Sequence, residues 1–246
     1  MSATTAVLRT EGRLFAREPA SLFWILAFPT ILLVIFGLIP SFRESNPDLG
    51  GRSVFDLYVP ICVMLAMIAA GLLTFPISLM TYRESGVLRR LRTTPVSPAP
   101  IVFAQLVLYA TAIVISTVIV FVVATMGFGS PLPESMSGYL VAYALCLVTS
   151  LGFGAVIAAV TPNAKIGQAI GMCIFFPAMF TAGVYVPVET FSGWLRTVVT
   201  FSPYGAGSNA FNDAVIGSFP EWSDLAIMAG WAVLLLTNAV RFFRWE

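Results

Sequence analysis

Six uninterrupted apolar stretches dominate the sequence, and none of them contains Asp, Glu, Lys or Arg. A hydrocarbon core about 30 Å thick needs about 20 helical residues per crossing, whereas barrel strands are about 10 residues long and alternate in polarity. The lengths of these stretches therefore favour helices. We predict an all-α membrane protein, one transmembrane domain over residues 1–246, with transmembrane helices at 20–39, 57–82, 101–127, 138–161, 166–188 and 225–240.

Composition excludes the main soluble classes. Hydrophobic residues make up 58% of the chain and charged residues only 10%, against about 25% charged residues in an ordinary soluble domain. A surface with so few charges would expose large apolar patches to water. The formal net charge of +1 also argues against a phosphate-tracking surface, so we expect no nucleic-acid partner.

Missing residue types narrow the chemistry further. The chain has no histidine, which excludes a Ser-His-Asp triad and an HExxH zinc site. Its single lysine, Lys165, does not lie in a GxxxxGK[ST] phosphate-binding loop, and Cys62, Cys146 and Cys173 are far apart in apolar runs. We therefore expect no catalytic residue, metal or bound cofactor in this chain, and no ATP hydrolysis by it alone.

Cations are distributed unevenly between the predicted loops. With a cytoplasmic N-terminus, ten cations lie inside and three, Arg43, Arg52 and Arg196, lie outside. The inner ones are Arg9, Arg13, Arg17, Arg83, Arg89, Arg90, Arg92, Lys165, Arg241 and Arg244. By the positive-inside rule we predict that both termini are cytoplasmic. No A-x-A cleavage site follows the first apolar run, so we expect that run to stay as a membrane anchor.

An amphipathic pattern precedes the first span, within residues 1–19. At 100° per residue, Arg9, Arg13 and Arg17 form one stripe. The apolar residues on the other side are Val7, Leu8, Leu14 and Phe15. The pattern is typical of a helix in the membrane interface with its guanidinium groups toward anionic headgroups. A solvated tail is the alternative.

The loop between the second and third spans has a second amphipathic pattern. Val87, Leu88 and Leu91 cover an arc of about 100° that also contains Glu84. The rest of the circumference carries Arg83, Arg89, Arg90 and Arg92. A helix here ends at Thr94, because the residue before a proline is disfavoured in the α region. We predict a short cytoplasmic helix, with a plain positive-inside loop as the alternative.

The segment between the fifth and sixth spans, residues 189–222, is rich in aromatic residues and broken by proline and glycine. Such a segment cannot cross the membrane as one helix, but it suits a re-entrant hairpin whose backbone is buried in protein. We predict an outer helical hairpin here. A belt of aromatic anchors is the alternative.

Two motifs carry a resemblance to a known family. The run from Tyr82 to Ser97, YRESGVLRRLRTTPVS, resembles the first cytoplasmic loop of type 2 ABC exporter permeases, especially their daunorubicin-resistance and lipooligosaccharide-nodulation branch. Gly183–Pro187, GVYVP, with the later Glu189, Trp194 and Ser202-Pro203, is similar to the family's stretch after span five. Two departures concern Val87, where many relatives have threonine, and Ser-Pro-Tyr-Gly, where relatives commonly have Pro-Leu-Thr.

The resemblance implies an assembly of two permease chains and two ATP-binding cassette subunits in the bacterial plasma membrane, with ATP and Mg bound by the ATPase. The second permease would be an identical copy or a paralogue. The N-terminal helix would connect to the ATPase, and the loop after span two would be a coupling helix docked in a groove on it. The implied coupling residues are Arg83, Glu84, Gly86, Val87, Leu88, Arg89, Arg90, Leu91 and Arg92. Apolar contact and bidentate arginine pairing are consistent with this role.

The transported molecule is expected to be hydrophobic or amphipathic, such as a drug, an antibiotic or a lipid, because the spans lack ionisable groups. In the family, spans two and five approach the two-fold axis. The candidate path residues are therefore Met64, Met67 and Phe75 on span two, and Phe175, Phe176 and Phe180 on span five. Packing inside the bundle is the alternative for each of them.

Span five also contains a GxxxG pair, Gly167 and Gly171. Small residues at this spacing let two helix backbones approach closely in a membrane. We predict a close contact between two permease chains here, with packing against another helix of the same chain as the alternative.

Three other functions remain as rivals of an exporter permease. An ion-coupled secondary transporter is disfavoured, because such proteins place ionisable groups at mid-membrane and often show inverted repeats, and neither is evident. An intramembrane protease would lack its histidine or embedded carboxylates. A scaffold or assembly protein is compatible with the composition, but it does not account for the arginine-rimmed loop.

Overall fold

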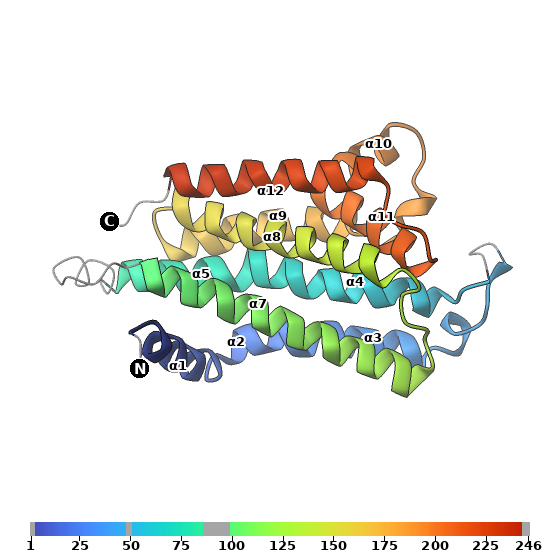
Figure 1. The fold of residues 1–246 in the computed structure, drawn as a ribbon, viewed down its shortest axis with the longest axis horizontal. Coiled ribbons are helices and arrows are strands. Elements are labelled where there is room, and N and C mark those ends of the chain that lie inside the picture. The colour runs from blue at the N-terminus through green and yellow to red at the C-terminus, as the bar shows by residue number, and fades with distance from the viewer. Residues whose placement is uncertain (1–2, 48–50, 86–98, 243–246) are drawn as a thin grey trace.

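A computed structural model describes residues 3–47, 51–85 and 99–242. It is a bundle of helices (Figure 1), and the described part of the chain forms no β-strand beyond an isolated bridge between Ser45 and Ser53. Six helical stretches are long and apolar enough to cross a membrane, which confirms the predicted fold class. They are Pro19–Leu38, Val54–Glu84, Ile101–Gly127, Met136–Val160, Ala164–Thr181 and Trp222–Phe242.

The first three spans are built from several helical segments each. Span one comprises α2 (Pro19–Leu22), a π-helical turn (Phe23–Ala27) and α3 (Phe28–Leu38), and span two comprises α4 (Val54–Ala69), a π-helical turn (Ala70–Thr74) and α5 (Phe75–Glu84). Span three is α7 (Ala99–Val122) with a π-helical turn (Val123–Gly127). Spans four to six are α8 (Met136–Val160), α9 (Ala164–Thr181) and α12 (Trp222–Phe242).

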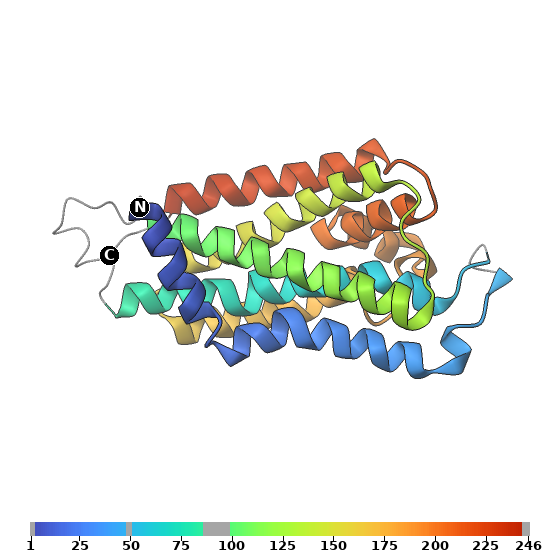
Figure 2. The same ribbon diagram turned by 60° about the horizontal axis from the view of Figure 1, so that its bottom comes forward.

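The remaining helices lie at the two ends of the bundle. The N-terminal helix α1 (Ala3–Phe15) lies at the same end as the last turn of α12, and Figure 2 shows it crossing α7 at a steep angle. At the opposite end, α10 (Gly193–Phe201) and α11 (Pro203–Val215) occupy the segment predicted as an outer hairpin. The α11 helix packs against α4, α8 and α12, whereas α10 exposes Trp194 and Phe201. Their depth relative to a bilayer stays a prediction.

Span five is shorter than the predicted range 166–188, because α9 ends at Thr181, just before Gly183 with its φ of 83°. Other helical ends extend beyond the ionisable-free limits read from the sequence. Span two begins three residues earlier, because Ser53 and Asp56 form a capping box: the Asp56 N–H donates to Ser53 Oγ (3.2 Å) and the Ser53 N–H donates to the Asp56 carboxylate (3.1 Å). Asp224 likewise lies in the first turn of α12. Carboxylates in a first turn interact favourably with the helix dipole. The spans thus carry charged residues, but in their terminal turns.

Span two is the centre of the bundle. Every residue in its most apolar 18-residue window is buried, whereas only 28–44% of the equivalent windows of the other five spans is buried. In a membrane protein the outward faces of such helices contact lipid. The other spans therefore surround span two and separate it from the bilayer.

Proline interrupts span two at the point where its neighbours come closest. Pro76 has no N–H, so the carbonyls one turn before it lose a donor, and the π-helical turn Ala70–Thr74 lies there. Gly154 of α8 and Gly171 of α9 face this turn. A Cβ atom at Gly154 would overlap the Gly71 carbonyl oxygen, and one at Gly171 would overlap the Leu72 carbonyl oxygen. Only glycine fits this approach.

Span one contains a similar break, and a hydroxyl compensates for it. Pro29 cannot donate to the carbonyl of Ile25, four residues earlier. The buried Ser116 of α7 donates to that oxygen from its Oγ at 2.6 Å. Span three therefore supplies the hydrogen bond that the proline removes, as the absence of water in a membrane requires.

We expect Gly171→Ala to destabilise the chain by about 1–3 kcal/mol, because the added methyl group meets a backbone carbonyl that cannot rotate away. Gly230→Ala in α12 is the matched control, since a Cβ there meets no atom within 4 Å. It should be neutral or stabilising by up to about 1 kcal/mol. Thermal unfolding of both variants in detergent measures this, and equal transition temperatures would contradict the packing assignment.

Candidate functional site

The last turn of span two is bonded to the C-terminal end of span four. The Arg83 guanidinium donates to the carbonyl of Ala158 (Nη1 to O, 3.1 Å) and, through Nη2, to the carbonyl of Thr161. These oxygens lie at the C-terminal end of α8, where helix carbonyls have no intrahelical donor. Arg83, which the family resemblance implies as a coupling residue, thus caps α8 in this chain.

Glu84 is bonded to the start of span five. Its Oε1 accepts from the N–H of Ala164 (2.6 Å), the first residue of α9, and the Asn163 side chain accepts from the N–H of Ile166 (3.0 Å). Carboxylates are favoured at helix N-termini because free N–H groups and the helix dipole meet there. We call the bonds of Arg83 and Glu84 to the α8–α9 connection the loop clamp.

A buried carboxylate joins three helices at the same end. Glu11 of α1 is only 7% exposed. Its Oε2 accepts from the hydroxyl of Tyr82 on α5 (2.5 Å) and from Nε2 of Gln105 on α7 (2.6 Å). The Gln105 carbonyl in turn accepts from Ser78 Oγ (3.2 Å). The N-terminal helix is therefore bonded to spans two and three through this carboxylate.

Glu11 is a functional candidate that the sequence reasoning missed. At 100° per residue it lies within 40° of Val7 and Phe15, inside the predicted apolar side of the helix. A lone acid in an apolar face is the signal that could have found it. The arginine stripe lies on the opposite face of the helix, and Arg9, Arg13 and Arg17 are exposed in the structure. Whether that face contacts lipid headgroups stays a prediction.

A second polar contact holds the junction between α1 and span one. Ser21 Oγ donates to the Glu18 carboxylate (2.9 Å) and lies 3.4 Å from the hydroxyl of Tyr109 on α7. The ring of Phe15 packs edge-on against Tyr109, with ring centroids 5.1 Å apart. Phe15, on the apolar side of α1, therefore packs against α7, whereas Leu14 is 51% exposed.

The remaining coupling candidates begin two residues after Glu84. Gly86, Val87, Leu88, Arg89, Arg90, Leu91 and Arg92 lie outside the described residues. Their role in docking the ATPase stays a prediction. The loop clamp lies just before this segment in the sequence.

The candidate path residues separate into two groups. Met64, Met67, Phe75 and Phe175 are buried inside the chain, and the ring of Phe175 packs against Trp24 of span one. Phe176 is 58% exposed on α9, and Phe180 is partly exposed. Only the last two present surface to a second chain or to a transported molecule, and a role for any of the six stays a prediction.

The glycine pair of span five contacts span two of the same chain, the alternative that the sequence left open. A Cβ at Gly167 would overlap the sulfur of Met80, and one at Gly171 would overlap the carbonyl oxygen of Leu72. Both glycines are buried. This pair therefore does not supply a contact between two permease chains, because its close approach is already used within one chain.

The end of the bundle opposite α1 has its own polar contacts. Arg52 Nη1 donates to the Asn212 side chain on α11 (3.0 Å), and Ser130 Oγ donates to Asp56 (2.6 Å). Partial burial raises the pKa of the Asp213 carboxyl, and the nearby Glu221 carboxylate adds to that rise although its backbone N–H, bonded to Asp213, opposes it. Among the described residues, no group of three His, Cys, Asp or Glu side chains could hold a metal ion.

Comparison with known proteins identifies the family. Residues 2–215 match the ABC-2 type transporter family, so the chain belongs to that family. It is similar to the daunorubicin resistance ABC transporter permease protein DrrB1 of Streptomyces coeruleorubidus, with 24% identity over 99% of this chain and 87% of that protein. It is also similar to ABC transporter G family member 20 of Dictyostelium discoideum, with 22% identity over 80% of this chain and 27% of that protein. The six apolar helices and the family together indicate a multi-pass membrane protein.

We expect Glu11→Ala to lower the free energy of unfolding by about 1–3 kcal/mol, because it leaves the Tyr82 hydroxyl and the Gln105 amide without their acceptor in a buried site. Arg13→Ala, on the exposed face of the same helix, should change it by less than about 0.5 kcal/mol. Thermal unfolding in detergent compares the two. Equal losses would show that the Glu11 contacts do not stabilise this end of the bundle.

Proposed function

We propose that this chain is the membrane-spanning permease subunit of an ATP-driven exporter. Two such chains, identical or paralogous, would pair with two ATP-binding subunits that bind ATP and Mg, in a bacterial plasma membrane with both termini in the cytoplasm. The family and the permease relative from Streptomyces support the general role. The excess of cations in the predicted inner loops supports the orientation.

The observation that carries the proposal is the loop clamp. Residues 86–98, which contain the proposed ATPase contact, begin two residues after Glu84, the last residue of span two. Arg83 and Glu84 bond this point to the ends of spans four and five, and Tyr82 bonds it to α1. A force applied to the loop therefore reaches four elements at once, α1 and spans two, four and five, instead of the end of span two alone.

The interior of span two supplies a place for bending. A helix transmits displacement along its axis, and a π-helical turn followed by proline weakens the regular hydrogen-bond ladder. The Ala70–Thr74 turn and Pro76 lie between the loop clamp and the outer half of span two. We propose that the cytoplasmic half, α5, moves relative to α4 about this turn during transport.

The proposed cargo is hydrophobic or amphipathic. The exposed side of α9 carries apolar side chains, among them Met172 and Phe176, and this side is available to a second permease chain. A path between two such faces would have few polar groups to bind ions or sugars. The drug-resistance function in the name of the Streptomyces relative agrees with this class of cargo.

Coupling can be tested by separating docking from transmission. Leu88→Asp places a charge in the proposed apolar ridge, so we expect loss of ATPase co-purification and of drug-stimulated hydrolysis. Glu84→Ala removes only the bond to α9, so the ATPase should still co-purify while transport per ATP falls. Arg92→Ala, at the rim, is the matched control and should have a small effect. Wild-type behaviour of Leu88→Asp would overturn the coupling assignment.

Cargo class can be tested with the full complex in liposomes. Amphipathic dyes and a phospholipid analogue should move in an ATP-dependent way, whereas a hydrophilic sugar should not. The expectation follows from spans whose charged residues are confined to their terminal turns. Movement of hydrophilic solutes alone would contradict it.

A further inference from the structure

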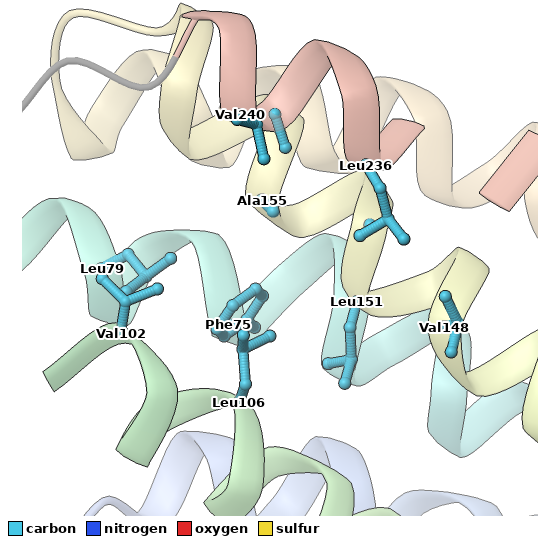
Figure 3. Close-up of a pocket in the computed structure, with 11 residues that line it drawn as sticks. Phe75, Leu79, Val102, Leu106, Val148, Leu151, Ala155, Leu236 and Val240 are labelled. Carbon is cyan, nitrogen blue, oxygen red and sulfur yellow. The ribbon is translucent and has the colours of Figure 1, made fainter. Parts of the chain in front are cut away.

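The flank of the bundle contains an apolar cavity of about 570 Å³. Figure 3 shows Val102 and Leu106 of α7 on one side and Leu236 and Val240 of α12 on the other, with Phe75 and Leu79 of α5 between them. Ligand pockets typically measure about 300–1,000 Å³. The cavity is thus large enough for a ligand and lies away from the exposed face of α9 that carries Phe176.

Small residues of α8 create the space. Gly152 and Ala155 line the cavity, and a Cβ at Gly152 would lie only 3.1 Å from Cβ of Leu235, so α8 and α12 are closely packed there. The α7 helix takes no part in this close contact between α8 and α12. A gap therefore remains between α7 and α12, and it opens outward where Val240 is 83% exposed.

The depth of the cavity corresponds to one leaflet. Leu79 lies five residues before the end of span two at Glu84, and Val240 lies two residues before the end of α12 at Phe242, both toward the end that carries the loop clamp. Val148 is the midpoint of α8. A membrane-spanning bundle has its bilayer midplane near the middle of such helices. The cavity therefore extends from the headgroup region of one leaflet to the midplane, which is the depth that an acyl chain covers.

The lining discriminates between possible occupants. Each of the eleven described lining residues is apolar, and none offers a side-chain hydrogen bond. Pockets for drug-like molecules have a few polar groups that orient the ligand. A saturated acyl chain needs none. The exposed Arg241 follows the lining residue Val240 directly in the chain, and its guanidinium carbon lies 5.7 Å from the centroid of the Phe242 ring.

We propose that this cavity binds one acyl chain of an anionic phospholipid whose headgroup pairs with Arg241. Arginine near a helix end places its charge at headgroup level and attracts anionic lipid. With the orientation proposed above, the lipid belongs to the cytoplasmic leaflet. The bound acyl chain fills the gap between α7 and α12. It also supports the side of α5 that lines the cavity, and α5 is the part of span two that carries the loop clamp.

Photolabelling tests this site. The full chain is reconstituted in phosphatidylcholine vesicles that contain phosphatidylglycerol with a diazirine on one acyl chain, and the labelled peptides are mapped after illumination. We expect label on the peptides containing Leu79, Val102 and Leu236, and competition by unlabelled phosphatidylglycerol. Arg241→Gln should weaken that competition about fivefold. The probe occupies both leaflets and no ATP is added, so the outcome does not depend on orientation or on export.

Two variants fill the cavity from different helices, Ala155→Phe from α8 and Val102→Phe from α7. Both should reduce labelling of the cavity peptides severalfold, and the second remains informative if the first does not fold. Val233→Phe is the matched control, because Val233 is 65% exposed on α12 and does not line the cavity. It should leave the labelling unchanged.

Three results would overturn the proposal. Even labelling of all outward-facing helices, unchanged by both filling variants, would indicate ordinary boundary lipid. Displacement of the probe by an uncharged hydrophobic dye but not by phosphatidylglycerol would assign the cavity to transported molecules. Equal competition by phosphatidylcholine, with no effect of Arg241→Gln, would exclude the proposed contact between the headgroup and Arg241.

Discussion

The enclosure of span two is the constraint on which the rest of this structure depends. Inside a bilayer each backbone polar group must find its partner within the protein, yet Pro76 removes a donor from the middle of this span. A π-helical turn lies at this interruption, and two glycines, Gly154 and Gly171, let α8 and α9 pack directly against the interrupted backbone. The positions of spans four and five follow from this close approach.

Two kinds of interaction divide the molecule along its length. The middle of the bundle is held by apolar packing and close backbone contact, whereas the end that carries α1 is held by charged and polar side chains. Glu11, Arg83 and Glu84 bond α1 and spans three, four and five to the last turn of span two. Polar bonds are directional, so they suit the transmission of movement that we propose for this end. Apolar contacts are not directional, so they allow the bending that we propose deeper in the bundle.

Much of this architecture could be predicted from the sequence. The six spans and the family follow from hydropathy and from the motif after Tyr82, because both are local properties of the chain. The candidate site was only partly predictable. Arg83 and Glu84 were recognisable as important residues, but their partners at Ala158 and Ala164 are about 80 residues away. Glu11 was recognisable only as a lone acid in an apolar face, because its partners Tyr82 and Gln105 are 71 and 94 residues away in the sequence.

The sequence by itself determined that the chain crosses a membrane six times as helices, since length and apolarity decide that without reference to neighbours. Only the tertiary structure decided which faces meet. Soluble helices reveal their buried face by an apolar stripe, but helices in lipid are apolar all round, so no periodicity marks the inner side. Gly167 and Gly171 could therefore be read as a contact between chains, and the fold pairs them with Met80 and Leu72 of their own chain instead.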